Sequence, residues 1–92
     1  MNGYQRRLVM NKHGITPEQD FILGLVYEKR VMLAGDILRE CMALKVASHA
    51  TAHKYFKDLV TRDFLQHEKG KDTRYKNIFL NANGVTYMEE TK

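Results

Sequence analysis

The 92-residue sequence contains a single cysteine, Cys41, and no apolar run close to the ~20 residues that a membrane-spanning helix needs. One cysteine cannot form an intrachain disulfide, and the N-terminus has no hydrophobic signal-peptide core. These absences predict a protein of the reducing interior of the cell, in the cytoplasm and with no membrane partner. Cys41 is then expected to be a small core residue.

Motifs that mark common catalytic sites are also missing. The chain has no G-x-S-x-G, no phosphate-binding glycine loop and no pair of carboxylates with an identifiable partner base. His49 and His53 are four residues apart, a spacing that can present two ring nitrogens to one metal ion, but the sequence places no third ligand beside them. We therefore expect no enzyme activity, no metal site and no cofactor.

The formal net charge of +4 is distributed unevenly along the chain. Residues 45–76 carry eight Lys/Arg against four Asp/Glu, residues 1–44 carry six against five, and residues 77–92 carry one against two. The positive excess therefore lies in the middle segment, as expected if that surface meets a polyanion. A chain of this length forms one domain.

The stretch SHATAHKYFKDLVTRDFL, residues 48–65, has the strongest pattern in the sequence. Ser48 is a good N-cap, since its hydroxyl can accept from a free backbone N–H in the first turn of a helix. Apolar residues at three- and four-residue spacing form one stripe: Ala52, Tyr55, Phe56, Leu59 and Val60. The opposite face is small and basic, with His49, Ala50, His53, Lys54, Lys57 and Thr61. This pattern is typical of a helix that reads DNA in the major groove.

The segments before this helix give weaker signals. Residues 1–14 form an arm or a short helix that ends at Gly14. Thr16-Pro17-Glu18-Gln19 is a capping box with proline in the first turn, and predicts a helix to residue 29 or 30. Its buried stripe is expected to be Phe21, Ile22, Leu25 and Val26. Residues 31–33 are a short strand, and residues 36–42 form a second helix with Ile37, Leu38 and Cys41 inward. A turn at residues 43–47 then leads into the Ser48 helix.

After the Ser48 helix the apolar period changes to two. Residues 64–69 and 75–80 are expected to form strands joined by a turn at residues 70–73, and Asn81 can cap a last helix over residues 82–89. A helix-turn-helix followed at once by a hairpin predicts a mostly α winged helix-turn-helix fold with a β-hairpin wing. Residues 1–15 would be the arm or short helix, and residues 16–92 the winged-helix domain.

Several short motifs carry a resemblance to a known family: Ser48-x-Ala50-Thr51, Leu59, Phe64-Leu65, Asp72-x-Arg74 and Leu80-x-x-x-Gly84. In order and spacing they resemble the MarR-type winged-helix DNA-binding proteins, over roughly residues 16 to 90. The resemblance implies a recognition helix over residues 48–62. It also implies a wing in which Asp72 holds Arg74 toward the minor groove or the DNA backbone.

The chain departs from the family pattern at three places. Asp63 stands where a glycine usually opens the wing, Asn81 replaces a threonine before the last helix, and the turn between the two helices is longer and has no glycine. The family also carries long flanking helices that dimerise and enclose a ligand pocket, for which this chain has little length. A small-molecule effector is therefore disfavoured.

The hypothesis from these patterns is double-stranded DNA binding by a small transcriptional regulator associated with the nucleoid. Its DNA-binding residues would be Ser48, His49, Thr51, His53, Lys54, Lys57, Lys69, Lys71, Arg74 and Lys76. A homodimer is expected because one helix reads only a few base pairs, and its contacts would come from Tyr4, Leu8, Val85 and Met88.

Two other interpretations stay open. The winged helix could be a protein-interaction module within a larger complex, for which DNA binding would be weak and independent of sequence. It could also serve replication or single-stranded nucleic acid, with Tyr55 and Tyr75 exposed to stack on bases.

Overall fold

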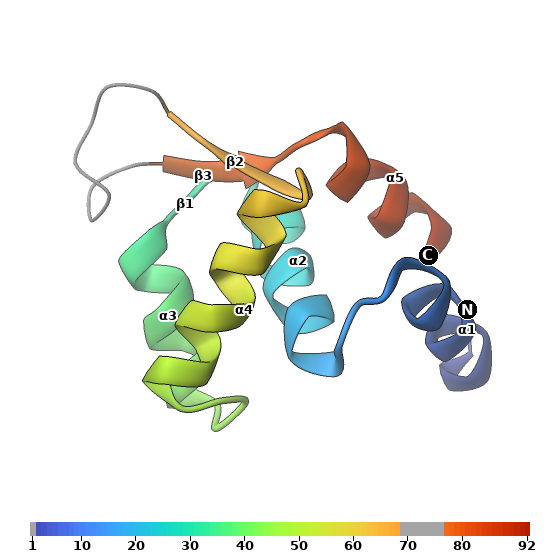
Figure 1. The fold of residues 1–92 in the computed structure, drawn as a ribbon, viewed down its shortest axis with the longest axis horizontal. Coiled ribbons are helices and arrows are strands. Elements are labelled where there is room, and N and C mark those ends of the chain that lie inside the picture. Colours follow the sequence, from blue (N-terminus) through green and yellow to red (C-terminus); the bar gives the residue numbers. More distant parts are fainter. Residues whose placement is uncertain (1, 69–76) are drawn as a thin grey trace.

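The computed structural model describes residues 2–68 and 77–92 (Figure 1). In these residues the elements are, in chain order, α1 (Gly3–His13), α2 (Pro17–Lys29), β1 (Met32–Leu33), α3 (Ala34–Ala43), α4 (His49–Thr61), β2 (Leu65–His67), β3 (Asn77–Leu80) and α5 (Ala82–Glu90). None of the helices in the described ranges is both long and apolar enough to cross a membrane. The expected order of elements is confirmed.

Helix α2 starts with the capping box that the sequence predicts. The Thr16 hydroxyl accepts from the Gln19 N–H and the Gln19 carboxamide oxygen accepts from the Thr16 N–H, each at 3.1 Å. Its buried residues are Gln19, Ile22, Leu23 and Val26, while Phe21 and Leu25 are only half-buried. The predicted stripe is therefore partly wrong, because α2 packs against α3, α4, α5 and β3 and buries more than one side.

Helix α3 begins at Ala34, two residues earlier than predicted, and has no side-chain cap. Ile37 and Cys41 are buried as expected. The turn to α4 contains no glycine, yet Lys45 adopts a left-handed backbone with φ of 57°. The Val46 N–H then reaches back to the Cys41 carbonyl at 2.8 Å, which closes the end of α3 and turns the chain toward α4.

The three strands form one antiparallel sheet in the order β1-β3-β2. Met32 pairs with Ile78, and Leu65 pairs with Leu80. The first hairpin strand begins at Leu65, one residue later than expected, because Asp63 adopts a left-handed backbone with φ of 62° and Phe64 is buried before pairing starts. Residues 69, 75 and 76 of the two predicted strands lie outside the described residues. The family's usual glycine at position 63 thus has a physical reason, which aspartate meets at some strain.

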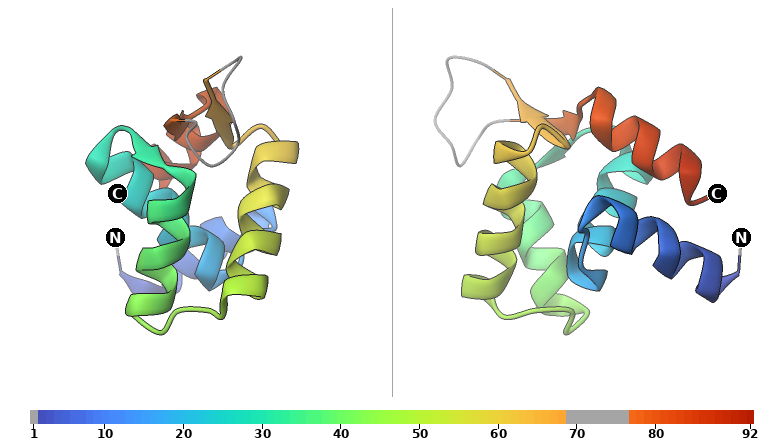
Figure 2. Two further views of the ribbon diagram at one scale, coloured as in Figure 1. Left: turned by 90° about the vertical axis from the view of Figure 1, so that its left-hand side faces the viewer. Right: turned by 45° about the vertical axis from the view of Figure 1, so that its right-hand side comes forward.

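Helix α1 is a regular helix rather than an extended arm. The Asn2 side chain accepts from the Gln5 N–H at 2.8 Å, and Gly14 ends the helix in the left-handed region with φ of 65°. Lys12 and His13 both approach Glu90 of α5, each at 3.3 Å. These two contacts lower the pKa of the Glu90 carboxyl, with the hydrogen bond from His13 as the larger cause. Figure 2 shows α1 and α5 on the same side of the molecule as both termini, with α4 on the other side.

A buried tyrosine joins α1, α2 and α5. Tyr87 is 0% exposed and donates its hydroxyl hydrogen to Asp20 Oδ1 at 2.7 Å. Arg6 donates to both oxygens of the same carboxylate, at 2.9 and 3.0 Å. Burial, with the Asp20 carboxylate beside it, raises the pKa of the Tyr87 hydroxyl well above its ordinary value. Tyr87 therefore stays a neutral donor across the physiological range.

Gly84 allows α5 to approach the chain before β2. A side-chain carbon at this position would overlap the carbonyl oxygen of Phe64, and would lie 3.0 Å from the Leu80 side chain. The Phe64 carbonyl also accepts from the Asn81 N–H at 3.0 Å, so it has little freedom to move. The glycine in the family-like motif is thus required by packing between α5 and the segment after α4.

We predict that Gly84→Ala lowers the free energy of unfolding by about 1–3 kcal/mol, the usual cost of forcing atoms into a filled site. Urea unfolding followed by circular dichroism measures this change. Gly24→Ala is the matched control: a carbon at Gly24 meets nothing within 4 Å. Alanine there should raise stability by up to about 1 kcal/mol through helix propensity. Equal stability of wild type and Gly84→Ala would contradict the packing argument.

Candidate nucleic-acid interface

Helix α4 begins at the N-cap that the sequence predicts. The Ser48 hydroxyl oxygen accepts from the Thr51 N–H at 3.3 Å, and donates to the Thr51 hydroxyl oxygen at 3.1 Å. The backbone at Ser48 is extended, with φ of −68° and ψ of 165°, as a capping residue requires. These bonds use part of the capacity of both hydroxyls, and leave Ser48 at the surface.

The two faces of α4 differ broadly as expected. Ala52, Phe56 and Leu59 are buried in the core, whereas Tyr55 and Val60 of the predicted stripe are only half-buried. Of the candidate DNA contacts on this helix, those at the surface are Ser48, His49, His53, Lys54 and Lys57. Thr51 is half-buried, and its hydroxyl oxygen accepts from the Ser48 hydroxyl. The structure therefore places five of the six helix candidates where a large partner can reach them.

His49 and His53 lie one turn apart with their rings stacked. The ring centroids are 6.4 Å apart and the planes differ by 10°. Within residues 2–68 and 77–92, no group of three His, Cys, Asp or Glu side chains could hold a metal ion. The pair offers ring nitrogens as hydrogen-bond donors or acceptors at the start of α4.

Lys54 and Lys57 lie along a groove between α4 and the start of α2. The groove has a volume of about 540 Å³, and its lining includes Thr16, Tyr55 and Thr61. Lys54 Nζ is 6.0 Å from the centre of the Tyr55 ring. Two exposed ammonium groups beside hydroxyl donors suit a phosphate backbone that follows the flank of α4.

The four wing candidates Lys69, Lys71, Arg74 and Lys76 lie outside the described residues. The strands that lead toward them are described. The Glu68 N–H donates to the Asn77 carbonyl at 3.1 Å, and the Asn77 side chain donates to the Glu68 carboxylate at 2.9 Å. Strand β2 follows α4 after a three-residue connection, which keeps this hairpin beside the helix.

The residues that hold α4 in place through hydrogen bonds were not identified from the sequence. Gln19 is 2% exposed and donates its side-chain N–H to Asp58 Oδ2 at 2.7 Å. Arg62, just after α4, donates to the Gly14 carbonyl at 3.0 Å and to the His13 carbonyl. These bonds join α4 to α2 and to the end of α1. No local pattern indicates them, since the partners are far apart in the chain.

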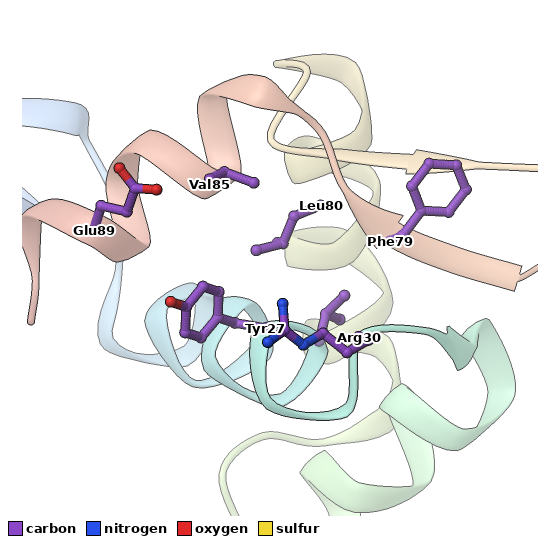
Figure 3. Close-up of a pocket in the computed structure, with 7 residues that line it drawn as sticks. Tyr27, Arg30, Phe79, Leu80, Val85 and Glu89 are labelled. Carbon is purple, nitrogen blue, oxygen red and sulfur yellow. The ribbon is translucent and has the colours of Figure 1, made fainter.

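A second cavity lies between α2, β3 and α5 (Figure 3). It has a volume of about 280 Å³ and is lined by Val26, Tyr27, Arg30, Phe79, Leu80, Val85 and Glu89. Ligand pockets usually have volumes of roughly 300–1,000 Å³. The cavity is therefore at the small end for a bound molecule, and none of its lining residues belongs to α3 or α4.

Helix α3, the turn and α4, followed directly by the β2–β3 pair, define a winged helix-turn-helix. Solved structures with the same fold include a mutant of MepR from S. aureus bound to oligodeoxyribonucleotide. Its sequence is 24% identical to this one, and the two structures match with a TM-score of 0.76 over 96% of this chain and 63% of the MepR chain. No family model matches the sequence, and no curated protein matches it significantly.

Two further structures agree. The transcriptional regulator Tm0710 from Thermotoga maritima is 25% identical with a TM-score of 0.76, covering 96% of this chain and 60% of its own. MarR from Staphylococcus aureus, in complex with salicylate and kanamycin, is 24% identical with a TM-score of 0.74, covering 94% and 55%. The chain thus has the MarR-type winged-helix fold, as its motifs indicate, and spans less than two thirds of these proteins.

We predict that Ser48→Ala lowers the free energy of unfolding by about 1 kcal/mol, the usual cost of losing an N-cap acceptor. Ser48→Asp should keep wild-type stability, because its carboxylate can accept the same N–H and suits the positive end of the helix dipole. Thermal and urea unfolding measure both variants. If alanine and aspartate were equally destabilising, the cap at Ser48 would not support α4.

Proposed function

We propose that this protein is a small transcriptional regulator that binds double-stranded DNA with α4 in the major groove. The observation that carries the proposal is the exposed basic face of α4, presented by a helix-turn-helix with its other face in the core. The S. aureus MepR–DNA complex, which is 25% identical with a TM-score of 0.72, supports it. Phosphate contacts supply most of the affinity, and base contacts supply the sequence preference.

The candidate residues divide by their place on α4. Ser48, His49, Thr51 and His53 lie in the first turns, where a recognition helix meets base edges. Lys54 and Lys57 line the groove, where they would contact phosphates. In the wing, Lys69, Lys71, Arg74 and Lys76 would add contacts to the backbone or the minor groove.

A homodimer is part of this proposal, because two helices read a two-fold symmetric site. Tyr4, Leu8 and Val85 are 73%, 51% and 37% exposed, and offer apolar contacts on α1 and α5. Met88 is only 7% exposed, so the expectation that it contacts a second copy is wrong. Residues 16–92 would form the DNA-binding domain. The protein would act without catalysis, in the cytoplasm and on the nucleoid.

Selection from a randomised duplex library at near-physiological salt tests the function directly. The enriched duplex is then titrated with salt against a scrambled duplex and a single strand. A two-fold symmetric motif, preferred over the scramble, is the expected result. Equal weak binding to all three would favour a protein-interaction module, and preference for the single strand would favour a replication accessory.

Lys57→Ala should weaken binding about equally for the enriched and scrambled duplexes, because a lysine–phosphate contact carries no sequence information. The slope of log K against log salt should fall in magnitude by ~1. Lys29→Ala removes an exposed lysine at the far end of α2, and should leave the slope unchanged. An unchanged slope for Lys57→Ala would remove Lys57 from the phosphate contacts.

His49→Ala/His53→Ala should weaken binding to the enriched duplex more than binding to the scramble, because base contacts supply the sequence preference. Each lost base contact should cost about 1–3 kcal/mol of discrimination. Fluorescence anisotropy with both duplexes measures the two affinities. Equal losses on both duplexes would remove His49 and His53 from the base contacts.

A further inference from the structure

Arg62 connects the end of α4 to the end of α1. It is the residue after the last one in α4, and its guanidinium donates to the Gly14 carbonyl at 3.0 Å and to the carbonyl of His13. These two carbonyls lie at and just after the C-terminus of α1, where the last helical carbonyls have no partner within the helix. A positive group at this end is also favoured by the helix dipole. Arg62 thus caps a helix to which it does not belong.

The other contacts of Arg62 fix its direction. Its Nη1 also donates to Asp58 Oδ2 at 3.3 Å, one turn earlier in α4. The same carboxylate oxygen accepts from the buried side chain of Gln19 at 2.7 Å. The guanidinium lies 5.0 Å from the centre of the Phe64 ring. Two helices and the segment after α4 therefore contact this group, which is still 33% exposed and also lines the groove beside Lys54 and Lys57.

These bonds determine the orientation of α4 more than they contribute to its formation. Ala52, Phe56 and Leu59 bury the apolar face and hold the helix in the core. Apolar contacts are not directional, however, and allow a helix to slide or turn slightly. Hydrogen bonds from Arg62 and Gln19 specify distance and angle, which a site for base recognition needs to within about 0.5 Å and 10–20°.

We propose that Arg62 is a positioning residue for DNA recognition, which sets the orientation of α4 through the end of α1 and through Asp58. The inference rests on the proposed function and assigns Arg62 a part in sequence preference without contact to DNA. The charges of Lys54 and Lys57 capture DNA of any sequence, whereas Arg62 makes the helix precise enough to distinguish one sequence from another.

The experiment compares Arg62→Lys with wild type on the enriched duplex and on its scramble. Lysine keeps the charge but cannot bond both carbonyls and the Asp58 carboxylate in a planar fork. Affinity for the enriched duplex should fall about tenfold, similar to the loss of one base contact, with the scramble and the salt slope unchanged. Amide hydrogen exchange in the free protein should speed up in α4 and remain unchanged in the core of α2.

Arg39→Lys is the matched control, because Arg39 pairs only with Asp36 on its own helix, at 2.9 Å, among the contacts of the described residues. It should change neither affinity nor exchange. Affinities are compared at a temperature where circular dichroism shows each variant to be folded. If Arg62→Lys does not fold, Asp58→Asn removes the charge that directs Arg62 and should give the same loss of preference.

Two results would overturn the proposal. A fall in salt slope of ~1, with equal losses on both duplexes, would make Arg62 a phosphate contact. Unchanged preference together with unchanged exchange in α4 would leave it a surface residue without a positioning role. If wild type binds no duplex, the proposed function fails. Faster exchange in α4 of Arg62→Lys would then still show that Arg62 orders the helix.

Discussion

The structure depends on hydrogen bonds from polar side chains of α2, the helix that the others surround. Gln19 is buried and Asp20 is partly buried, and such side chains cost stability unless they are hydrogen-bonded, so each needs a partner from another helix. Gln19 finds Asp58 on α4, and Asp20 finds Arg6 on α1 and Tyr87 on α5. The apolar core brings these helices together, and these bonds decide how they are oriented. The same hydrogen bonds from α2 therefore stabilise both the fold and the position of the candidate interface.

Much of the fold could be predicted because its signals are local. The capping box at Thr16, the N-cap at Ser48 and the cap at Asn81 act over three residues or fewer, and each starts a helix where the sequence indicates. Helix boundaries without such signals were predicted less accurately: α3 has no side-chain cap and begins two residues before the predicted start. The buried side of α2 was also partly wrong, because a helix packed on several sides does not follow a single stripe.

For the candidate interface, the sequence predicted which residues of α4 are exposed. It did not predict the hydrogen bonds that hold α4 in place. A helical period separates the exposed Lys57 from the buried Phe56, because amphipathic spacing reflects which face meets the core. The bond between Gln19 and Asp58 spans 39 residues, and that between Arg62 and Gly14 spans 48. Such partners meet only through the tertiary fold, so no pattern in one sequence marks them. The left-handed backbone at Asp63 was indicated only by the family resemblance, in which this position usually carries glycine.

The contacts between α1 and α5, which lie at opposite ends of the sequence, affect how the chain folds during synthesis. Helix α1 has 11 residues and none fully buried, and isolated helices shorter than about 12–15 residues are marginal in water. Its Arg6 bonds to the Asp20 carboxylate, which also accepts from Tyr87, and to the Thr91 carbonyl. Its Lys12 donates to Glu90. A ribosome makes the N-terminus first, so α1 leaves the tunnel long before these partners exist. Helix α1 therefore gains these stabilising contacts only after α5, at the other end of the domain, has been translated.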